Sequence, residues 1–129
     1  PSKIEASLEV LKNHDFVYIH IEAPDECGHM GDEKLKVKAI EDFDKKVVSP
    51  VANYIKENPD TVLLILPDHP TPCSIKTHTS DPVPFVLYNP KISPDSTQVY
   101  SEKEAKKGAL NFQYPWELLD HFLSLSGKE

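Results

Sequence analysis

The chain alternates between short continuous apolar runs and longer stretches in which apolar residues recur at helical spacing. Continuous runs of this length predict strands that are buried on both faces of a sheet. Stretches with helical spacing predict helices that pack one face against a core. The predicted strands are residues 15–21, 61–66 and 83–88, the predicted helices are residues 2–12, about 32–57, 101–108 and from 115 onward, and residues 22–33 are a predicted loop.

The longest helical stretch carries its own start and break signals. Asp32 is suited to be its N-cap, and Glu33 places negative charge in the first turn, where the helix dipole favours it. Ser49-Pro50 predicts a kink or a new helical start, because proline cannot donate a backbone hydrogen bond. The apolar face predicted to pack on the core is Val37, Ile40, Val47, Val48, Val51, Tyr54 and Ile55. The charged face predicted to lie in solvent is Lys36, Lys38, Glu41, Asp42, Lys45 and Lys46.

The order strand, long helix, strand predicts the fold class. Such a βαβ unit places its two strands side by side and parallel, joined by a right-handed crossover. We therefore expect an α/β protein with a mostly parallel sheet flanked by helices, and a single α/β domain over residues 1–129. A helix that leads directly into a strand at the start of the chain indicates a piece of a longer protein. The apolar stripe of the last helix, expected to pack on the core, is Trp116, Leu119, Phe122 and Leu123.

Composition narrows the classes of partner. The net charge is −7, so we do not expect binding to nucleic acid or to an anionic membrane, whose phosphates the chain would not neutralise. A small phosphorylated substrate fits this charge if bound cations reverse the local sign. The longest apolar run, Val62–Leu66, is too short to span a bilayer. Cys27 and Cys73 do not form a disulfide framework, and the expected location is the cytoplasm.

Aspartate and histidine side chains gather just beyond the predicted strands. Asp25 and His29 follow the first strand, Asp68 and His69 follow the second, and His78 lies in the loop before the third. Because the carboxyl ends of parallel strands meet at one edge of a sheet, we expect these side chains to share one site. Imidazole nitrogen combined with carboxylate oxygen favours zinc or manganese over magnesium or calcium. An isolated Asp-His pair is more often a hydrogen-bonded surface or capping pair, so the prediction depends on their joint placement.

Several neighbours of these residues have their own expected roles. Thr71 and Lys76 are predicted to support the metal ligands from outside the coordination shell. Gly28 and Gly31 are expected to serve backbone turns. His20 lies within a predicted strand and is expected to be a core histidine rather than a ligand.

Three motifs carry a resemblance to a known family, and they are Asp25-Glu-Cys-Gly-His29, Asp68-His-Pro-Thr-Pro72 and His78-Thr-Ser-Asp-Pro-Val-Pro84. In their order and spacing they resemble the carboxy-terminal part of cofactor-independent phosphoglycerate mutase of the archaeal type. That family belongs to the alkaline phosphatase superfamily of two-metal enzymes, and the resemblance covers roughly residues 12–88. It implies an alkaline-phosphatase-like fold that is incomplete at its amino-terminal side.

The resemblance also implies a distribution of metal ligands. Asp25, His29 and His78 match the ligands of one divalent ion, manganese or zinc, and Asp68 and His69 match part of the shell of a second. The family's nucleophilic serine and one further aspartate ligand would lie upstream, outside this chain. The intact enzyme would interconvert 3-phosphoglycerate and 2-phosphoglycerate, a glycolytic reaction, through a phosphoserine intermediate. The segment by itself is expected to be inactive and to hold one ion or none.

Other functions remain open at the level of the sequence. Pro70 and Glu22 stand where many members of the family carry serine and lysine, as in a bacterial branch that includes proposed homoserine kinases. A related phosphohydrolase or such a kinase is therefore an alternative enzyme. An alternative of another class is a metal-binding domain without catalysis.

Overall fold

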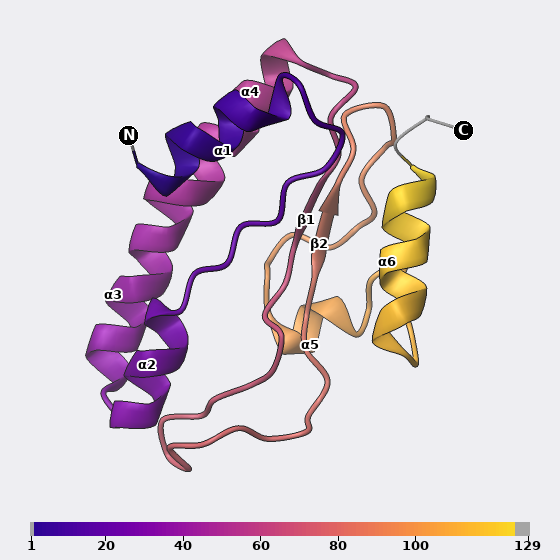
Figure 1. The fold of residues 1–129 in the computed structure, drawn as a ribbon. Coiled ribbons are helices and arrows are strands. Elements are labelled where there is room, and N and C mark those ends of the chain that lie inside the picture. The colour runs from indigo at the N-terminus through magenta and orange to yellow at the C-terminus, as the bar shows by residue number, and fades with distance from the viewer. Residues whose placement is uncertain (1, 126–129) are drawn as a thin grey trace. The chain divides into compact units, whose positions relative to one another are not determined.

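A computed structural model describes residues 2–125 of the chain (Figure 1). These residues divide into two compact units. The first combines the chain up to Tyr54 with Pro70–Thr79, and the second combines Ile55–His69 with the chain from Ser80 onward. The single α/β domain expected over residues 1–129 stays a prediction. Within residues 2–125, no helix combines the length and the apolar content needed to cross a bilayer.

The first unit is built from helices. The predicted first helix is confirmed as α1, and a capping box holds its start: the Glu5 N–H donates to Ser2 Oγ at 3.2 Å, and the Ser2 N–H donates to Glu5 Oε2 at 2.7 Å. The unit contains α1 (Lys3–Leu11), α2 (Ala23–Met30), α3 (Glu33–Phe43), the π-helical η1 (Asp44–Val48) and most of α4 (Ser49–Glu57) (Figure 1).

Helix α2 replaces the loop that we predicted over residues 22–33. Pro24 lies in its first turn, where the missing N–H costs nothing, and Asp25 adds favourable negative charge there. Gly31 ends the helix in the left-handed conformation, with φ 71°, so its predicted turn is confirmed. The loop prediction was wrong because the helix has only eight residues and few of them are apolar, so its two end signals are the clearest indication of it.

The helix does not restart at Ser49-Pro50 as predicted, because Ser49 itself is helical (φ −60°, ψ −49°), and the irregularity takes the form of a π-turn just before it. Asp32 caps α3 by accepting a hydrogen bond from Leu35 N at 2.9 Å. Before Pro50 the helix widens into η1, and the Ser49 N–H donates to the carbonyl of Asp44, five residues back. Proline has no N–H and its ring crowds the preceding turn, so the wider turn removes a clash that a continuous α-helix would contain.

The apolar face predicted for this long helix is wrong in its first half. Val51 and Ile55 are buried as expected, but Val37 is 56% exposed and Ile40 is 50% exposed. The π-turn explains the difference, because it inserts an extra residue and rotates the helical phase between α3 and α4. In α3 the half-buried positions are instead those of Lys36, Ala39, Asp42 and Phe43.

Residues 15–21 do not form the predicted strand. Their burial still alternates with a period of two, and Val17, Ile19 and Ile21 are half-buried. A ladder requires a neighbouring backbone, and in the described part of the chain none is hydrogen bonded to Val17–Ile21 as a strand partner. The parallel βαβ unit that we predicted is therefore absent from residues 2–125.

The second unit contains a small antiparallel sheet. Strand β1 (Leu63–Ile65) pairs with β2 (Val86–Tyr88), and Leu63 lies opposite Tyr88. Both strands fall inside predicted runs, but the mostly parallel sheet is wrong for the described residues. Prolines shorten the runs, because Pro67 follows β1 and Pro82 and Pro84 precede β2 without N–H groups to donate to a ladder.

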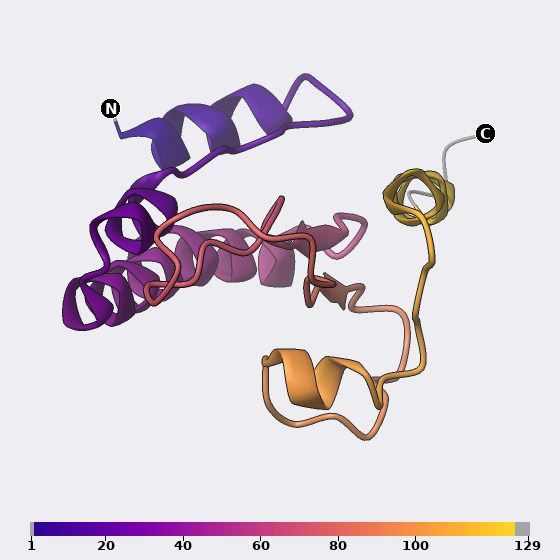
Figure 2. The same ribbon diagram turned by 90° about the horizontal axis from the view of Figure 1, so that it is seen from below.

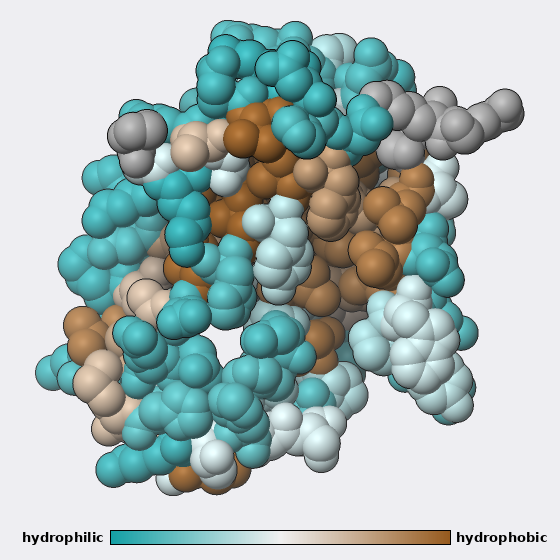
Figure 3. Space-filling model, in the orientation of Figure 1, coloured by the Kyte–Doolittle hydropathy of each residue, from teal (hydrophilic) through white to brown (hydrophobic). Residues whose placement is uncertain are grey.

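Two helices complete this unit, α5 (Glu102–Ala105) and α6 (Pro115–Ser124). The core stripe predicted for α6 is wrong: Leu118 is buried, whereas Trp116, Leu119 and Leu123 are exposed. Apolar side chains over α6 are open to view in Figure 3. Apolar residues occupy a wide face of α6, and the described residues of this unit bury only part of that face. Periodicity alone therefore did not identify Leu118 as the buried position.

Candidate metal centre

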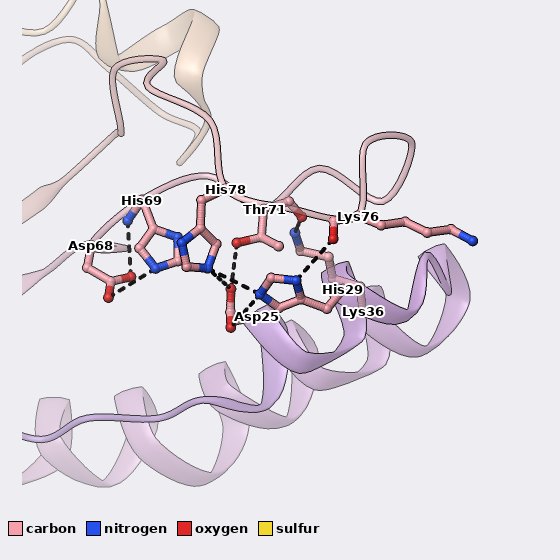
Figure 4. Close-up of polar contacts among 8 residues, drawn as sticks. All are labelled: Asp25, His29, Lys36, Asp68, His69, Thr71, Lys76 and His78. Carbon is pink, nitrogen blue, oxygen red and sulfur yellow. Dashed lines mark hydrogen bonds and ion pairs between the residues drawn. The ribbon is translucent and has the colours of Figure 1, made fainter.

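Helix α2 presents the first pair of candidate ligands. Asp25 and His29 are four residues apart, so their side chains lie on one side of the helix. His29 Nε2 is 3.3 Å from Asp25 Oδ2 (Figure 4). Local helical geometry is therefore enough to bring these two groups together.

The segment Pro70–Thr79 brings His78 to the same point. The segment passes over α2 and α3 (Figure 2) and is closed by a hydrogen bond from Thr79 N to Pro70 O at 3.2 Å. His78 Nε2 lies 3.3 Å from Asp25 Oδ1 and 3.1 Å from His29 Nε2 (Figure 4). Three groups that can bind a metal thus converge within the first unit.

The spacing of these atoms fits a shared cation. In a tetrahedral shell with bonds of ~2.1 Å, neighbouring ligand atoms are ~3.4 Å apart. His29 Nε2 is 3.3 Å from Asp25 Oδ2, His78 Nε2 is 3.3 Å from Asp25 Oδ1, and the two Nε2 atoms are 3.1 Å apart, all close to that separation. Two imidazole nitrogens and one carboxylate form a mixed ligand set that zinc and manganese accept.

A backbone carbonyl fixes the proton on His29. His29 Nδ1 is 3.0 Å from the carbonyl oxygen of Lys76, which can only accept, so Nδ1 carries the donated hydrogen. In neutral His29 the lone pair of Nε2 then points toward Asp25 and His78. Lys76 itself has a positive φ of 61°. The sequence predicted a supporting role for Lys76. The contact is made by the main-chain oxygen of Lys76, however, and the identity of the side chain could not indicate this.

Thr71 contacts the carboxylate of Asp25. Its side chain is 4% exposed, and its hydroxyl donates to Asp25 Oδ1 at 2.5 Å (Figure 4). Lys36 Nζ donates in turn to the Thr71 carbonyl oxygen at 2.6 Å. Lys36 was predicted to lie in solvent and is half-buried instead, so that prediction was wrong. Lys36 is three residues from Ala39 and so lies on the same side of α3, and this spacing could have indicated its burial.

Gly28 allows Thr71 to approach α2 so closely. A Cβ atom at Gly28 would lie 2.3 Å from the Thr71 carbonyl oxygen and 2.9 Å from Thr71 Cγ2. The backbone turn predicted for Gly28 is therefore wrong. The residue lies inside a helix, and its missing side chain makes room for the neighbouring segment.

Asp68 and His69 lie in the second unit and form a pair of their own. The His69 N–H donates to Asp68 Oδ1 at 3.0 Å, and His69 Nε2 lies 3.4 Å from Asp68 Oδ2 (Figure 4). The pair follows β1 as the sequence predicted. Its membership in one shared site with Asp25 stays a prediction.

The remaining histidines and cysteines lie apart from these contacts. His20 was expected in the core, but its ring is half exposed and lies 3.7 Å from Glu22 Oε1. Without a sheet neighbour on residues 15–21, the described residues of the first unit leave this ring half exposed. Cys27 is buried, and neither Cys27 nor Cys73 is in a disulfide, as expected.

A carboxylate and two histidines brought together in this way define a metal-binding class of protein. The chain matches the Metalloenzyme superfamily over residues 1–123, and it belongs to that family.

Individual relatives are more specific. The chain is 50% identical over 110 residues to the 2,3-bisphosphoglycerate-independent phosphoglycerate mutase of Methanosarcina barkeri, a match that covers 84% of this chain and 28% of that mutase. It is 43% identical over 122 residues to a probable enzyme of the same name from Geobacter sulfurreducens, covering 94% of this chain and 31% of the relative. The predicted resemblance to this mutase family is confirmed.

A solved structure shares the fold. A Pyrococcus horikoshii protein superposes with a TM-score of 0.85 at 31% identity, over 98% of this chain and 38% of that protein. The chain thus spans less than a third of the length of the curated relatives described above, and 38% of this solved structure.

Proposed function

We propose that this chain is the metal-binding portion of a cofactor-independent phosphoglycerate mutase that interconverts 3-phosphoglycerate and 2-phosphoglycerate. The observation that carries the proposal is the convergence of Asp25, His29 and His78 in the first unit. The similarity to the mutases of Methanosarcina barkeri and Geobacter sulfurreducens supports the choice of reaction.

In the proposed centre, Asp25, His29 and His78 hold one divalent ion, manganese or zinc. Asp68 and His69 contribute to a second ion, whose remaining ligands come from the rest of the longer protein. Such cations neutralise the charge of a transferring phosphoryl group and lower the pKa of a bound hydroxyl. The residues of this chain bind the ions and orient the ligands. Thr71 fixes the carboxylate of Asp25, and the Lys76 carbonyl fixes the tautomer of His29.

The rest of the longer protein is proposed to complete both the chemistry and the fold. Because this chain spans 28% of the Methanosarcina barkeri mutase, most of such an enzyme would lie outside it. We place the nucleophilic serine and the missing metal ligand there, together with strands that pair with residues 15–21. The alternating burial of Val17, Ile19 and Ile21 supports a strand at this position in an alkaline-phosphatase-like parallel sheet. The cytoplasm is the proposed location.

Activity of the longer protein tests the proposal. We expect conversion of 3-phosphoglycerate to 2-phosphoglycerate that depends on a divalent metal and is lost in His78→Ala. His14→Ala is the matched control, because His14 contacts only its own helix end, with Nδ1 3.1 Å from Val10 O among the described contacts. A longer protein that acts on homoserine and ATP, or that keeps full mutase activity in His78→Ala, contradicts the proposal.

A further inference from the structure

We propose that Lys36 is a positioning residue, which acts through Thr71 to hold the carboxylate of Asp25 in the orientation that binds metal. The inference rests on the metal centre proposed above. Lys36 contacts none of the three candidate ligands among the described contacts, so its role is distinct from theirs.

Three segments meet at Thr71. Asp25 lies on α2, Lys36 lies on α3, and Thr71 belongs to the segment Pro70–Thr79. Lys36 Nζ donates to the main-chain oxygen of Thr71 at 2.6 Å, and the Thr71 hydroxyl donates to Asp25 Oδ1 at 2.5 Å. One residue therefore receives a bond from α3 and gives a bond to α2.

The bond from Lys36 is placed where it can fix the main chain. The Thr71 oxygen is pressed against the backbone of Gly28, where a Cβ atom would lie only 2.3 Å away. The charged ammonium of Lys36 forms a stronger hydrogen bond to this oxygen than a neutral donor would. We infer that Lys36 holds the Thr71 main chain against α2 and keeps the hydroxyl aimed at Asp25.

The hydroxyl in turn determines how Asp25 can bind. A carboxylate that accepts a hydrogen bond on Oδ1 has that oxygen partly occupied, while Oδ2 faces His29 at 3.3 Å. Hydrogen bonds of this kind orient a ligating carboxylate, and their loss typically lowers metal affinity by ~10–100-fold. Loss of Lys36 should release the same constraint indirectly.

Lys38 provides a matched control on the same helix. It carries the same charge, but it bonds to Asp42 at 3.1 Å rather than to Thr71. A general effect of positive charge near the centre would appear in both lysine variants. An effect of the Thr71 contact would appear only when Lys36 is changed.

The test measures Co²⁺ binding to the longer protein that contains this chain, by calorimetry and by the visible absorption of the bound ion. We expect Lys36→Met to lower Co²⁺ affinity by ~10-fold and Thr71→Val by ~10–100-fold. Lys36→Arg and Thr71→Ser, which keep the donors, should stay near the parent affinity, as should Lys38→Met. Thr71→Val and Lys36→Met should also change the absorption of bound Co²⁺ in the same direction, because both alter the coordination of Asp25.

A double variant tests whether Lys36 acts through the hydroxyl. In a Thr71→Val background, Lys36→Met should produce little further loss of affinity, since the bond to Asp25 is already gone. Far-ultraviolet circular dichroism of each metal-free variant checks that the helices are intact. If Lys36→Met does not fold, Lys36→Gln takes its place with Lys38→Gln as its control, because glutamine removes the charged donor but remains polar.

The possible failures can be told apart. If the parent protein binds Co²⁺ and His78→Ala abolishes binding, but Lys36→Met equals Lys38→Met, the role of Lys36 is refuted and the centre stands. Additive losses in the double variant refute the path through Thr71. If His78→Ala leaves Co²⁺ binding unchanged, the centre itself is wrong and this inference fails with it.

Discussion

Replacing Gly28 by alanine tests the contact on which the candidate centre depends. The added Cβ would lie 2.3 Å from the Thr71 carbonyl oxygen and 2.9 Å from its methyl carbon. Carbon-to-oxygen contacts between neighbouring segments are normally ~3.3–3.6 Å, so the segment carrying Thr71 must retreat by about 1 Å. The nearest atom in conflict is the main-chain oxygen of Thr71, which cannot rotate away as the end of a flexible side chain could.

Two opposing terms set the effect on stability. Overpacking of this kind costs ~1–3 kcal/mol, whereas alanine is favoured over glycine inside a helix by ~0.5–1 kcal/mol. The free energy of unfolding should therefore fall by up to about 2.5 kcal/mol. The centre should suffer more, because a retreat of about 1 Å lengthens the hydrogen bond from Thr71 to Asp25 beyond bonding distance. Metal affinity should fall by ~10–100-fold.

Chemical denaturation and Co²⁺ titration of Gly28→Ala together measure both effects. Glu26→Ala is the control, because Glu26 is an exposed residue of the same helix whose loss removes only ~0.3–1 kcal/mol of dipole interaction. A Gly28→Ala chain that is as stable as the parent and binds Co²⁺ equally well would refute the close approach of Thr71 to α2.

Other predictions test pH dependence and the helical phase. Burial raises the pKa of Tyr100 to about 12, so its neutral form stabilises the fold below pH ~10 and this contribution is lost as pH rises toward 12. Tyr100→Phe should remove the latest phenolate step in an absorbance titration and flatten the loss of stability above pH ~10. Hydrogen bonds from the Thr97 hydroxyl and then from backbone N–H groups lower the pKa of Asp95, so its contribution is present above the ordinary aspartate pKa and lost as pH falls through the lowered value. Asp95→Asn should weaken the acid dependence of thermal unfolding, and an unchanged acid limb would contradict this. Val37→Ser should change the free energy of unfolding by less than ~0.5 kcal/mol, whereas Ile55→Ala should lower it by ~2–5 kcal/mol. Equal losses would show that Val37 packs on the core, as the sequence predicted.

Local features of the structure could be predicted from the sequence, and features that need a distant partner could not. Asp25 and His29 were placed together correctly because four residues in a helical turn bring side chains to one side. Residues 15–21 have strand-like burial, yet a strand also needs a neighbouring backbone, which apolar periodicity cannot supply. The antiparallel direction of β2 against β1 is likewise a property of the pairing and not of either run.

The π-turn shows how one local irregularity shifted a whole face. The apolar positions from Val37 to Ile55 fit one stripe only if the helix keeps an unbroken period. Pro50 signalled an irregularity but not the extra residue inserted before it. The extra residue changes the phase of the helix, so Val37 is exposed while Lys36 bonds to Thr71. Apolar periodicity could not indicate that contact, because it is made by a charged side chain.

The two residues that the sequence explained least, Gly28 and Thr71, account for each other. Neither is a candidate ligand, and they are 43 positions apart in the chain. A side chain at position 28 would push the segment of Thr71 away from α2, and without that segment His78 would have no route to Asp25. The glycine between Asp25 and His29 is therefore a condition for the third ligand rather than for a turn. On this reasoning Gly28 of the first motif and Thr71 of the second form one packing contact. Helix α2 carries the ligands Asp25 and His29 and has no side chain at position 28, and Thr71 packs in the space that this leaves.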